Sequence, residues 1–332
     1  METDTRPLMA IARDAAPPRP SWHVLLVRPE TMTLALLILG IFVGSQLSEF
    51  FLDISYILKS FTISAEFAIV ALVLTMVIIA GEIDLSPAAN MALSACLFAW
   101  AQDSGLAMPL AIAIGLGAGV LMGVFNGLMV IALQLPSIIV TIATLILYRG
   151  LAQVIAGDKS IRVPEWYIGI DKVMVAGIPL PIVIFVGLSL VLGLVMGMTI
   201  FGRQIYLIGT NEEAARHAGV RTRRIKMTLF VMMGLASAVA GLMTASRLGS
   251  VRYDLGLGGE LQMVLMAMLG GTYIFGGRGT ILGTFLAAWL LVIVSTGMIV
   301  ANWLPAWQLC VLGVLLIVSI IATNFIYSRA QR

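Results

Sequence analysis

The sequence contains little charge. Only 11% of its 332 residues are Asp, Glu, Lys or Arg, whereas a soluble domain usually has about 25%. By contrast, 60% of the residues are hydrophobic and the mean hydropathy is +1.03. A soluble fold of this size could not cover its surface with so few charges, so the composition predicts a chain embedded in the lipid bilayer. Basic clusters alternate with lipid-length apolar runs, so nucleic acid is not an expected partner.

Residues for metal binding and catalysis are also scarce. The two histidines, His23 and His217, are too few for a histidine-based metal site. The two cysteines, Cys96 and Cys310, lie in apolar runs and are predicted to be buried thiols. The motifs G-x-S-x-G, H-E-x-x-H and C-x-x-C are missing, and none of the four lysines follows a glycine, as a Walker A loop requires. We therefore expect no catalytic residue, no metal and no cofactor bound by this chain.

Long apolar runs fill most of the chain. A membrane helix needs ~20 residues, and ten runs approach or reach that length. They lie at 31–48, 64–81, 87–102, 107–133, 137–156, 180–201, 227–246, 259–275, 279–301 and 306–327. The third and eighth are short, and the amphipathic segment 50–67 is expected to lie outside, near the interface, rather than to cross. The sequence predicts an all-α polytopic membrane protein with about ten transmembrane helices, some of them short or broken.

Basic residues set the expected orientation. They gather before the first run, between the sixth and seventh, at Arg278, and at the C-terminus. Ten crossings place all four groups on one side, which is the cytoplasm by the positive-inside rule. The predicted organisation is a polar cytoplasmic N-terminal tail without a cleavable signal, a transmembrane domain, a cytoplasmic loop within it, and a short cytoplasmic C-terminal tail. The corresponding ranges are 1–30, 31–327, 202–226 and 328–332.

The most polar interruption of the apolar runs begins with GTNEEAARHAG, residues 209–219. Thr210 or Asn211 can cap a helix, and the two glutamates that follow sit in its first turn, where the helix dipole favours anions. Gly219 is placed to end that helix after about two turns. The sequence therefore predicts a short cytoplasmic helix.

Two interpretations of this helix remain open from the residues alone. A solvated loop that obeys the positive-inside rule accounts for the arginines that follow. It does not account for Ala214 and Ala215, which would give the helix a small, flat face. Such a face suits docking into a groove on a partner protein.

Several stretches resemble one family. Residues 213–219, EAARHAG, fit E-A-A-x-x-x-G and resemble the coupling segment of bacterial ABC importer permeases. Residues 81–86, GEIDLS, resemble the G-x-I-D-L-S motif of sugar permeases of the ribose and xylose type. Further segments of that family are matched by residues 123–130, 135–150, 234–243, 245–250 and 267–284. The resemblance runs from about residue 30 to the C-terminus and is strongest to the rhamnose permeases; Pro87 departs from the family pattern but suits a helix start.

The resemblance implies a multi-pass protein of the bacterial inner membrane that is a transporter subunit and not an enzyme. Its substrate would be a monosaccharide such as a pentose or a deoxyhexose, rhamnose included. Its implied partners are a cytoplasmic ABC ATPase subunit that uses ATP and Mg, a second permease (the same chain or a paralogue) and a periplasmic sugar-binding protein. The residues implied to couple to the ATPase are Glu212, Glu213, Ala214, Ala215, Arg216 and Gly219.

Other functions stay open beside this one. An ABC permease for autoinducer-2 or nucleosides would use the same architecture. An ion-coupled secondary transporter would favour ionisable residues deep in the helix bundle, and none sits clearly in the middle of a predicted helix. A membrane enzyme would need a cluster of catalytic groups at one face, which the sequence does not show.

Polar residues near the third predicted helix are candidates for the transport pathway or its gate. Glu82 and Asp84 flank Ile83 between two membrane helices, and Ser86 follows. These side chains could line a sugar path. Alternatively, Asp84 or Ser86 could cap the third helix at its N-terminus.

Five more polar residues lie inside apolar runs. Asn126 could form an interhelical hydrogen bond or contact a sugar. Thr141 and Thr144 could line the path or bond to carbonyls of their own helix. Glu260 and Gln262 begin the short eighth run, where they either complement the helix dipole or mark a discontinuous helix near the path.

Overall fold

The computed structural model describes residues 29–47 and 49–329, which are mostly helical. The predicted N-terminal tail lies, apart from its last two residues, outside the described part of the chain. The main helices are α2 (Pro29–Leu47), α3 (Ile54–Ile79), α4 (Pro87–Asp103), α5 (Met108–Ala132), α6 (Ser137–Ala156), α7 (Leu180–Met198), α8 (Ile200–Thr210), α9 (Glu212–His217), α10 (Thr222–Leu248), α11 (Gly259–Leu269), α12 (Ile281–Val300) and α13 (Pro305–Arg329). Short 3-10 turns are η1 (Glu49–Leu52), η2 (Glu165–Tyr167) and η3 (Ile170–Lys172), and two-residue strands are β1 (Ile161–Arg162), β2 (Met174–Val175), β3 (Ile178–Pro179) and β4 (Ser250–Val251).

Seven of these described helices are long and apolar enough to cross a membrane: α2, α3, α5, α6, α7, α10 and α12. The apolar helices α11 and α13, together with the buried helix α4, complete the ten predicted positions. The predicted fold class, an all-α polytopic membrane protein with some short helices, is confirmed.

The segment 50–67 is not a separate interfacial element, and that prediction is wrong. Asp53 caps α3 by accepting a hydrogen bond from the Ser55 N–H at 2.8 Å, and the helix then runs without a break to Ile79. Two polar residues of the segment are satisfied inside the fold: Thr62 donates to the Leu58 carbonyl, and Glu66 pairs with an arginine of α10. The segment therefore lengthens the second helix and adds no crossing.

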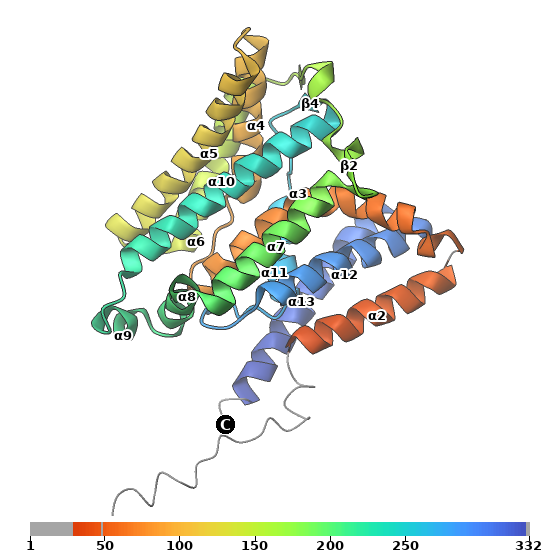
Figure 1. Ribbon diagram of the computed structural model, residues 1–332. Coiled ribbons are helices and arrows are strands. Elements are labelled where there is room, and N and C mark those ends of the chain that lie inside the picture. The colour runs from red at the N-terminus through yellow and green to blue at the C-terminus, as the bar shows by residue number, and fades with distance from the viewer. Residues whose placement is uncertain (1–28, 48, 330–332) are drawn as a thin grey trace, which may run out of the picture.

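Helices α3 and α4 form the centre of the bundle, and α10 lies across α3, α4 and α5 (Figure 1). Glycines allow the closest of these contacts. Gly119 and Gly123 of α5 face the backbone of α10 at Gly234 and Phe230, where an added Cβ would overlap main-chain atoms. Because small residues let membrane helices approach closely, this glycine row fixes α5 against α10.

The two ends of the bundle differ in structure. Helices α8 and α9 lie at one end, at the lower left of Figure 1, and we call it the α9 end. At the opposite end, β1 pairs with β4 in an antiparallel ribbon. Gly276 and Gly277 pack against Gly209 and Thr210, so the basic region 216–226 and Arg278 share the α9 end. This shared end agrees with the orientation that ten crossings predict.

Two expected spans are broken helices. The sixth run ends as a helix at Met198, and Thr199 caps the separate helix α8, so most of the polar loop 202–226 is helical. The eighth run forms only the 11 residues of α11, about 16 Å of helix, against a hydrocarbon core of about 30 Å. Of the two cysteines, Cys96 is buried as predicted, but Cys310 on α13 is exposed.

Candidate functional site

Helix α9 forms where the capping residues predict it. Asn211 adopts an extended conformation, and its side chain accepts a hydrogen bond from the Ala214 N–H at 2.9 Å. At the other end Gly219 has a φ of +85°, its N–H donates to the Arg216 carbonyl, and the Val220 N–H donates to the Ala215 carbonyl. This bond pair is the Schellman arrangement, which requires a left-handed residue at that position.

The outer face of α9 is more polar than the sequence predicts. Ala215 is buried against the hydrophobic core, so the flat face of two alanines does not exist, and that prediction is wrong. Ala214 is exposed beside Glu213 and Arg216, whose side chains form a solvent-exposed ion pair at 3.8 Å. Helix α9 thus packs on the core through Ala215, and its solvent-facing side consists of Ala214 and the Glu213–Arg216 ion pair.

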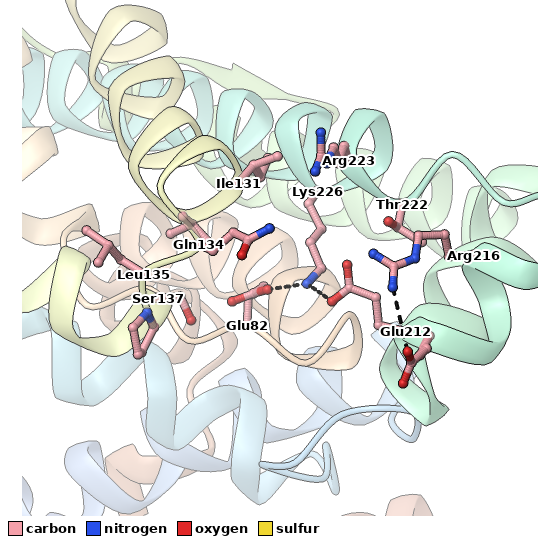
Figure 2. A pocket seen from close by; sticks show the side chains of 13 residues that line it. Glu82, Ile131, Gln134, Leu135, Ser137, Glu212, Arg216, Thr222, Arg223 and Lys226 are labelled. Carbon is pink, nitrogen blue, oxygen red and sulfur yellow. Dashed lines mark hydrogen bonds and ion pairs between the residues drawn. The ribbon is translucent and has the colours of Figure 1, made fainter.

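Lys226 of α10 joins the α9 helix to the turn after α3. Its Nζ contacts the Glu82 Oε1 at 2.5 Å and also the Glu212 Oε2. Figure 2 shows the lysine reaching down between the two carboxylates. The side chains of Lys226 and Glu82 are each only 11% exposed, so this pairing is largely shielded from solvent.

A cleft of about 510 Å³ opens beside these ion pairs at the α9 end. One wall consists of the end of α5 and the following loop, including Ile131 and Gln134, and the other wall consists of α9 and the start of α10 (Figure 2). Charged side chains of both signs, including Glu82, Arg216 and Arg223, line it. The cleft is therefore a polar opening between the loop after α5 and helix α9.

The turn 81–86 is held by hydrogen bonds from helix α6. The Ser137 hydroxyl accepts from the Ile83 N–H at 3.0 Å, and the Thr141 hydroxyl donates to the Ile83 carbonyl at 3.2 Å. Thr141 therefore bonds the turn, with a longer contact of 3.5 Å to its own helix, whereas Thr144 bonds the Thr141 carbonyl within α6. Because buried backbone groups need partners, α6 determines the conformation of this turn.

Asp84 and Ser86 begin a buried chain of polar groups. The Asp84 carboxylate accepts from both the Ser86 N–H and the Ser86 hydroxyl, at 2.8 and 2.7 Å. Ser86 occupies the position before α4 but makes no side-chain capping bond, so the capping interpretation is wrong for it. The hydrogen bond from the Ser86 N–H to Asp84 closes an Asx turn ahead of the helix. Asp84 accepts no hydrogen bond from an N–H within α4, so it does not cap that helix either. Burial raises the pKa of Asp84 to about 6, against the opposing effect of the two bonds from Ser86.

Asn126 extends this chain across the bundle. Its Nδ2 donates to the Ser86 hydroxyl at 2.8 Å, and its Oδ1 accepts from the Tyr148 hydroxyl at 2.9 Å. The predicted interhelical hydrogen bond is therefore present and links the start of α4, α5 and α6. Since Asn126 is 1% exposed and both its polar ends are occupied, its role here is to hold the three segments together.

The remaining two pathway candidates lie apart from this network. Glu260 and Gln262 are in the first turn of α11, and Gln262 lines an apolar groove against α13. Glu260 lies close enough to Arg149 to interact with it electrostatically, while Arg149 itself donates to the carbonyls of Tyr253 and Leu255 at 2.8 and 2.7 Å. The polar residues at the start of α11 thus do not belong to the hydrogen-bond network around the turn 81–86.

The sequence reading missed an intramembrane charge pair. Glu66 lies halfway along α3 with 1% exposure, and the Arg247 Nε donates to its Oε1 at 2.8 Å. This finding corrects the prediction that no acid lies deep in the bundle. A possible signal was Arg247 itself, an arginine at the end of an apolar run that needs a partner.

Lys226, Ser137 and Tyr148 were also missed as site residues. Lys226 was counted only as one of several basic residues, although it is the only lysine in a cluster of arginines. Ser137 and Tyr148 are ordinary residues of an apolar helix by sequence, and only the packing of α6 against α4 and α5 brings them to the turn 81–86 and Asn126.

A bundle of membrane helices with a capped helix at one end and a polar cleft beside it fits a membrane transport protein. The comparison with known families agrees. The family described as "Branched-chain amino acid transport system / permease component" matches residues 56–320, and the chain belongs to this family.

Three curated relatives narrow the comparison. The autoinducer 2 import system permease protein LsrD of Enterobacter sp. (strain 638) is 34% identical over 276 residues, which cover 81% of this chain and 84% of the relative. The LsrD of Klebsiella pneumoniae subsp. pneumoniae is 35% identical over 276 residues, covering 81% and 83%. The LsrD of Escherichia coli (strain K12) is 32% identical over 304 residues, covering 90% and 92%.

No solved structure matches the chain. The family and the relatives establish that the chain is a multi-pass inner-membrane permease of the ABC importer type. The rhamnose subgroup suggested by the sequence motifs is not the one that these relatives name.

Proposed function

We propose that this chain is the transmembrane subunit of an ATP-driven importer and forms the path for a small sugar-like solute. A periplasmic binding protein delivers the solute, a separate ATPase subunit hydrolyses ATP with Mg, and a second permease subunit, either the same chain or a paralogue, completes the pathway. The observation that supports this proposal best is helix α9, which is capped, exposed and linked to the core by Lys226.

Autoinducer 2 is the first candidate substrate. Three relatives that are 32–35% identical over at least 81% of this chain carry autoinducer 2 import in their names. A pentose or a deoxyhexose such as rhamnose is the second candidate, because the sequence motifs resemble sugar permeases. Both are small polyhydroxylated solutes, which a permease with few polar groups free to bind them could pass without holding them tightly.

The polar residues proposed for the pathway support a permease that binds its solute only weakly. The polar groups of Ser86, Asn126 and Thr141 already form hydrogen bonds with one another and with the turn 81–86. Groups already paired are poor ligands, because a solute would have to replace bonds that exist. Selectivity would therefore come from the binding protein.

An ion-coupled secondary transporter is the second candidate function. Glu66 and Asp84 are buried, and buried carboxylates in membrane proteins often carry protons. However, Glu66 is paired with Arg247 and Asp84 with Ser86, so both have structural partners.

The test is uptake by proteoliposomes. The chain is reconstituted with the second permease and the ATPase subunit of its system, and the loaded binding protein is added outside the vesicles, at the face equivalent to the periplasm. The proposal expects ATP-dependent uptake of labelled autoinducer 2, with rhamnose and a pentose as competitors. Uptake by the chain alone, driven by an H⁺ or Na⁺ gradient without an ATPase, would contradict it.

A further inference from the structure

Lys226 connects three parts of the chain that are distant in the sequence. Glu82 lies in the turn after α3, Glu212 is the first residue of α9, and Lys226 is in the first turns of α10. One ammonium group thus holds two carboxylates from separate elements. The Glu212 side chain is 45% exposed, whereas those of Lys226 and Glu82 are each 11% exposed. The ion pairs therefore connect the solvent-facing helix α9 to a pair that is largely shielded from solvent.

The end of α8, directly before α9, also meets the end of α3 through the backbone. Gly209, at the end of α8, has no room for a side chain, because a Cβ would overlap the Ile79 carbonyl and the Gly277 nitrogen. The Gly277 N–H donates to that same carbonyl at 2.8 Å. Main chain therefore lies directly on main chain, and the α8–α9 unit cannot move far without displacing the end of α3.

From the turn 81–86 the contacts continue into the bundle. Ser137 and Thr141 of α6 hold both backbone groups of Ile83, and Asn126 of α5 holds Ser86. A displacement of this turn must therefore strain or shift α5 and α6. An unbroken series of bonds runs from Glu212 to two membrane helices.

We propose that Lys226 is a positioning residue that transmits the movement of α9 to the turn 81–86, and through it to α5 and α6. This inference rests on the proposed function, in which an ATPase partner displaces α9. Separating a shielded charge from its partner leaves an uncompensated buried charge, so the three side chains move as a unit. Without the ammonium group, the Glu82 and Glu212 carboxylates repel each other, and only the backbone contact at Gly209 still joins the α8–α9 unit to the end of α3.

The test compares Lys226→Gln with Lys226→Arg in the complete transporter in proteoliposomes. Two rates are measured: ATP hydrolysis stimulated by the loaded binding protein, and substrate uptake. Lys226→Gln is expected to retain the ATPase subunit on purification and to hydrolyse ATP. Its uptake per ATP is expected to fall about tenfold, within the range that coupling free energies usually produce. Lys226→Arg keeps the charge and is expected to restore most of the ratio.

Lys59→Gln is the matched control, because Lys59 is an exposed lysine at the far end of α3. It is expected to match the unmodified chain in both rates. If Lys226→Gln does not assemble, Glu82→Gln serves instead, since it leaves the Lys226–Glu212 pair and removes only the link to the turn. It is expected to show the same loss of uptake per ATP.

If Lys226→Gln leaves uptake per ATP unchanged, whether or not both rates fall, the proposed role of Lys226 is overturned while the proposed function stays intact. By contrast, an unmodified chain that binds no ATPase subunit, or that transports without ATP, would overturn the proposed function and this inference together. Measurements on the unmodified chain therefore distinguish failure of the proposed function from failure of the role of Lys226.

Discussion

At the scale of residues, polar side chains in this permease serve mainly to hold the backbone. Asn126 bonds Ser86 and Tyr148, and Ser137 bonds the turn 81–86, so groups that look available for a sugar are already engaged. In a bilayer every buried polar group needs such a partner. The hydrogen bonds of these residues thus serve to assemble the bundle.

Asn126→Ala is expected to destabilise the protein by roughly 1–3 kcal/mol, because it leaves the Ser86 hydroxyl with one bond fewer in a dry environment. The loss is measured as a lower melting temperature of the purified protein in detergent. Ser189→Ala is the matched control, since the Ser189 hydroxyl bonds only the Phe185 carbonyl of its own helix at 2.7 Å. Equal melting temperatures for the two variants would contradict a linking role for Asn126.

Asp84 gives the stability of the fold a pH dependence. Its pKa is about 6 in the folded chain and about 3.9 when unfolded, so the folded state prefers the protonated acid. Its stabilising contribution is present below pH 4 and is lost as the pH rises to 6, by about 3 kcal/mol. Melting temperatures of the unmodified chain and of Asp84→Asn should diverge over this interval. A constant difference between the two across the interval would show that folding does not shift the pKa of Asp84.

At the scale of elements, α9 and its neighbours form one mechanical unit. Asn211 and Gly219 define the ends of α9, Gly209 seats α8 on the backbone of α3, and Lys226 ties α9 to the start of α10. The backbone contact at Gly209 is direct, and the Lys226 contact is a short ion pair. A coupling helix, which we propose α9 to be, needs such connections, because a loose contact would absorb the movement.

Gly209→Ala should loosen this seat, because the new methyl group overlaps the Ile79 carbonyl and the Gly277 nitrogen. A cost of roughly 1–3 kcal/mol is expected from such overpacking, together with a reduced uptake per ATP. Gly197→Ala in α7 is the control, since nothing lies within 4 Å of its added carbon. A variant at Gly209 that melts and transports like this control would show that the close approach does not matter.

Substitutions of Gly219 test the effect of backbone conformation at the end of α9 without adding a steric contact. Its φ is +85° and no atom lies within 4 Å of an added Cβ, so substitutions act through conformation alone. Gly219→Asn is expected to retain more ATP-driven uptake than Gly219→Val, because asparagine tolerates the left-handed region and valine does not. Equal uptake by both variants would indicate that the conformation at the end of α9 does not matter for transport.

Deletion of residues 211–219 is the severe form of the same change. It removes Glu212 and the exposed face of α9, so ATP-driven uptake should be abolished while the protein remains folded in the membrane. Folding is checked by a monodisperse elution profile and by the yield of membrane-inserted protein. Full uptake by this deletion would refute a docking role for α9.

At the scale of the whole molecule, apolar run length was enough to predict the fold class and nearly all of the ten helical positions. It did not predict the length of α3, because Glu66 and Thr62 look exposed until Arg247 and the helix backbone are seen beside them. Capping residues predicted α9 almost to the residue. The Lys226 connection needed three elements to meet in space, and no local pattern encodes that.

The central claim is that ATP bound by a separate subunit drives transport through this chain. It is tested most directly by measuring autoinducer 2 uptake into proteoliposomes that contain the permease with and without its ATPase subunit, each with and without ATP. The account predicts uptake only when the ATPase subunit and ATP are both present, and none from an H⁺ or Na⁺ gradient alone. Gradient-driven uptake by the permease without the ATPase would contradict it.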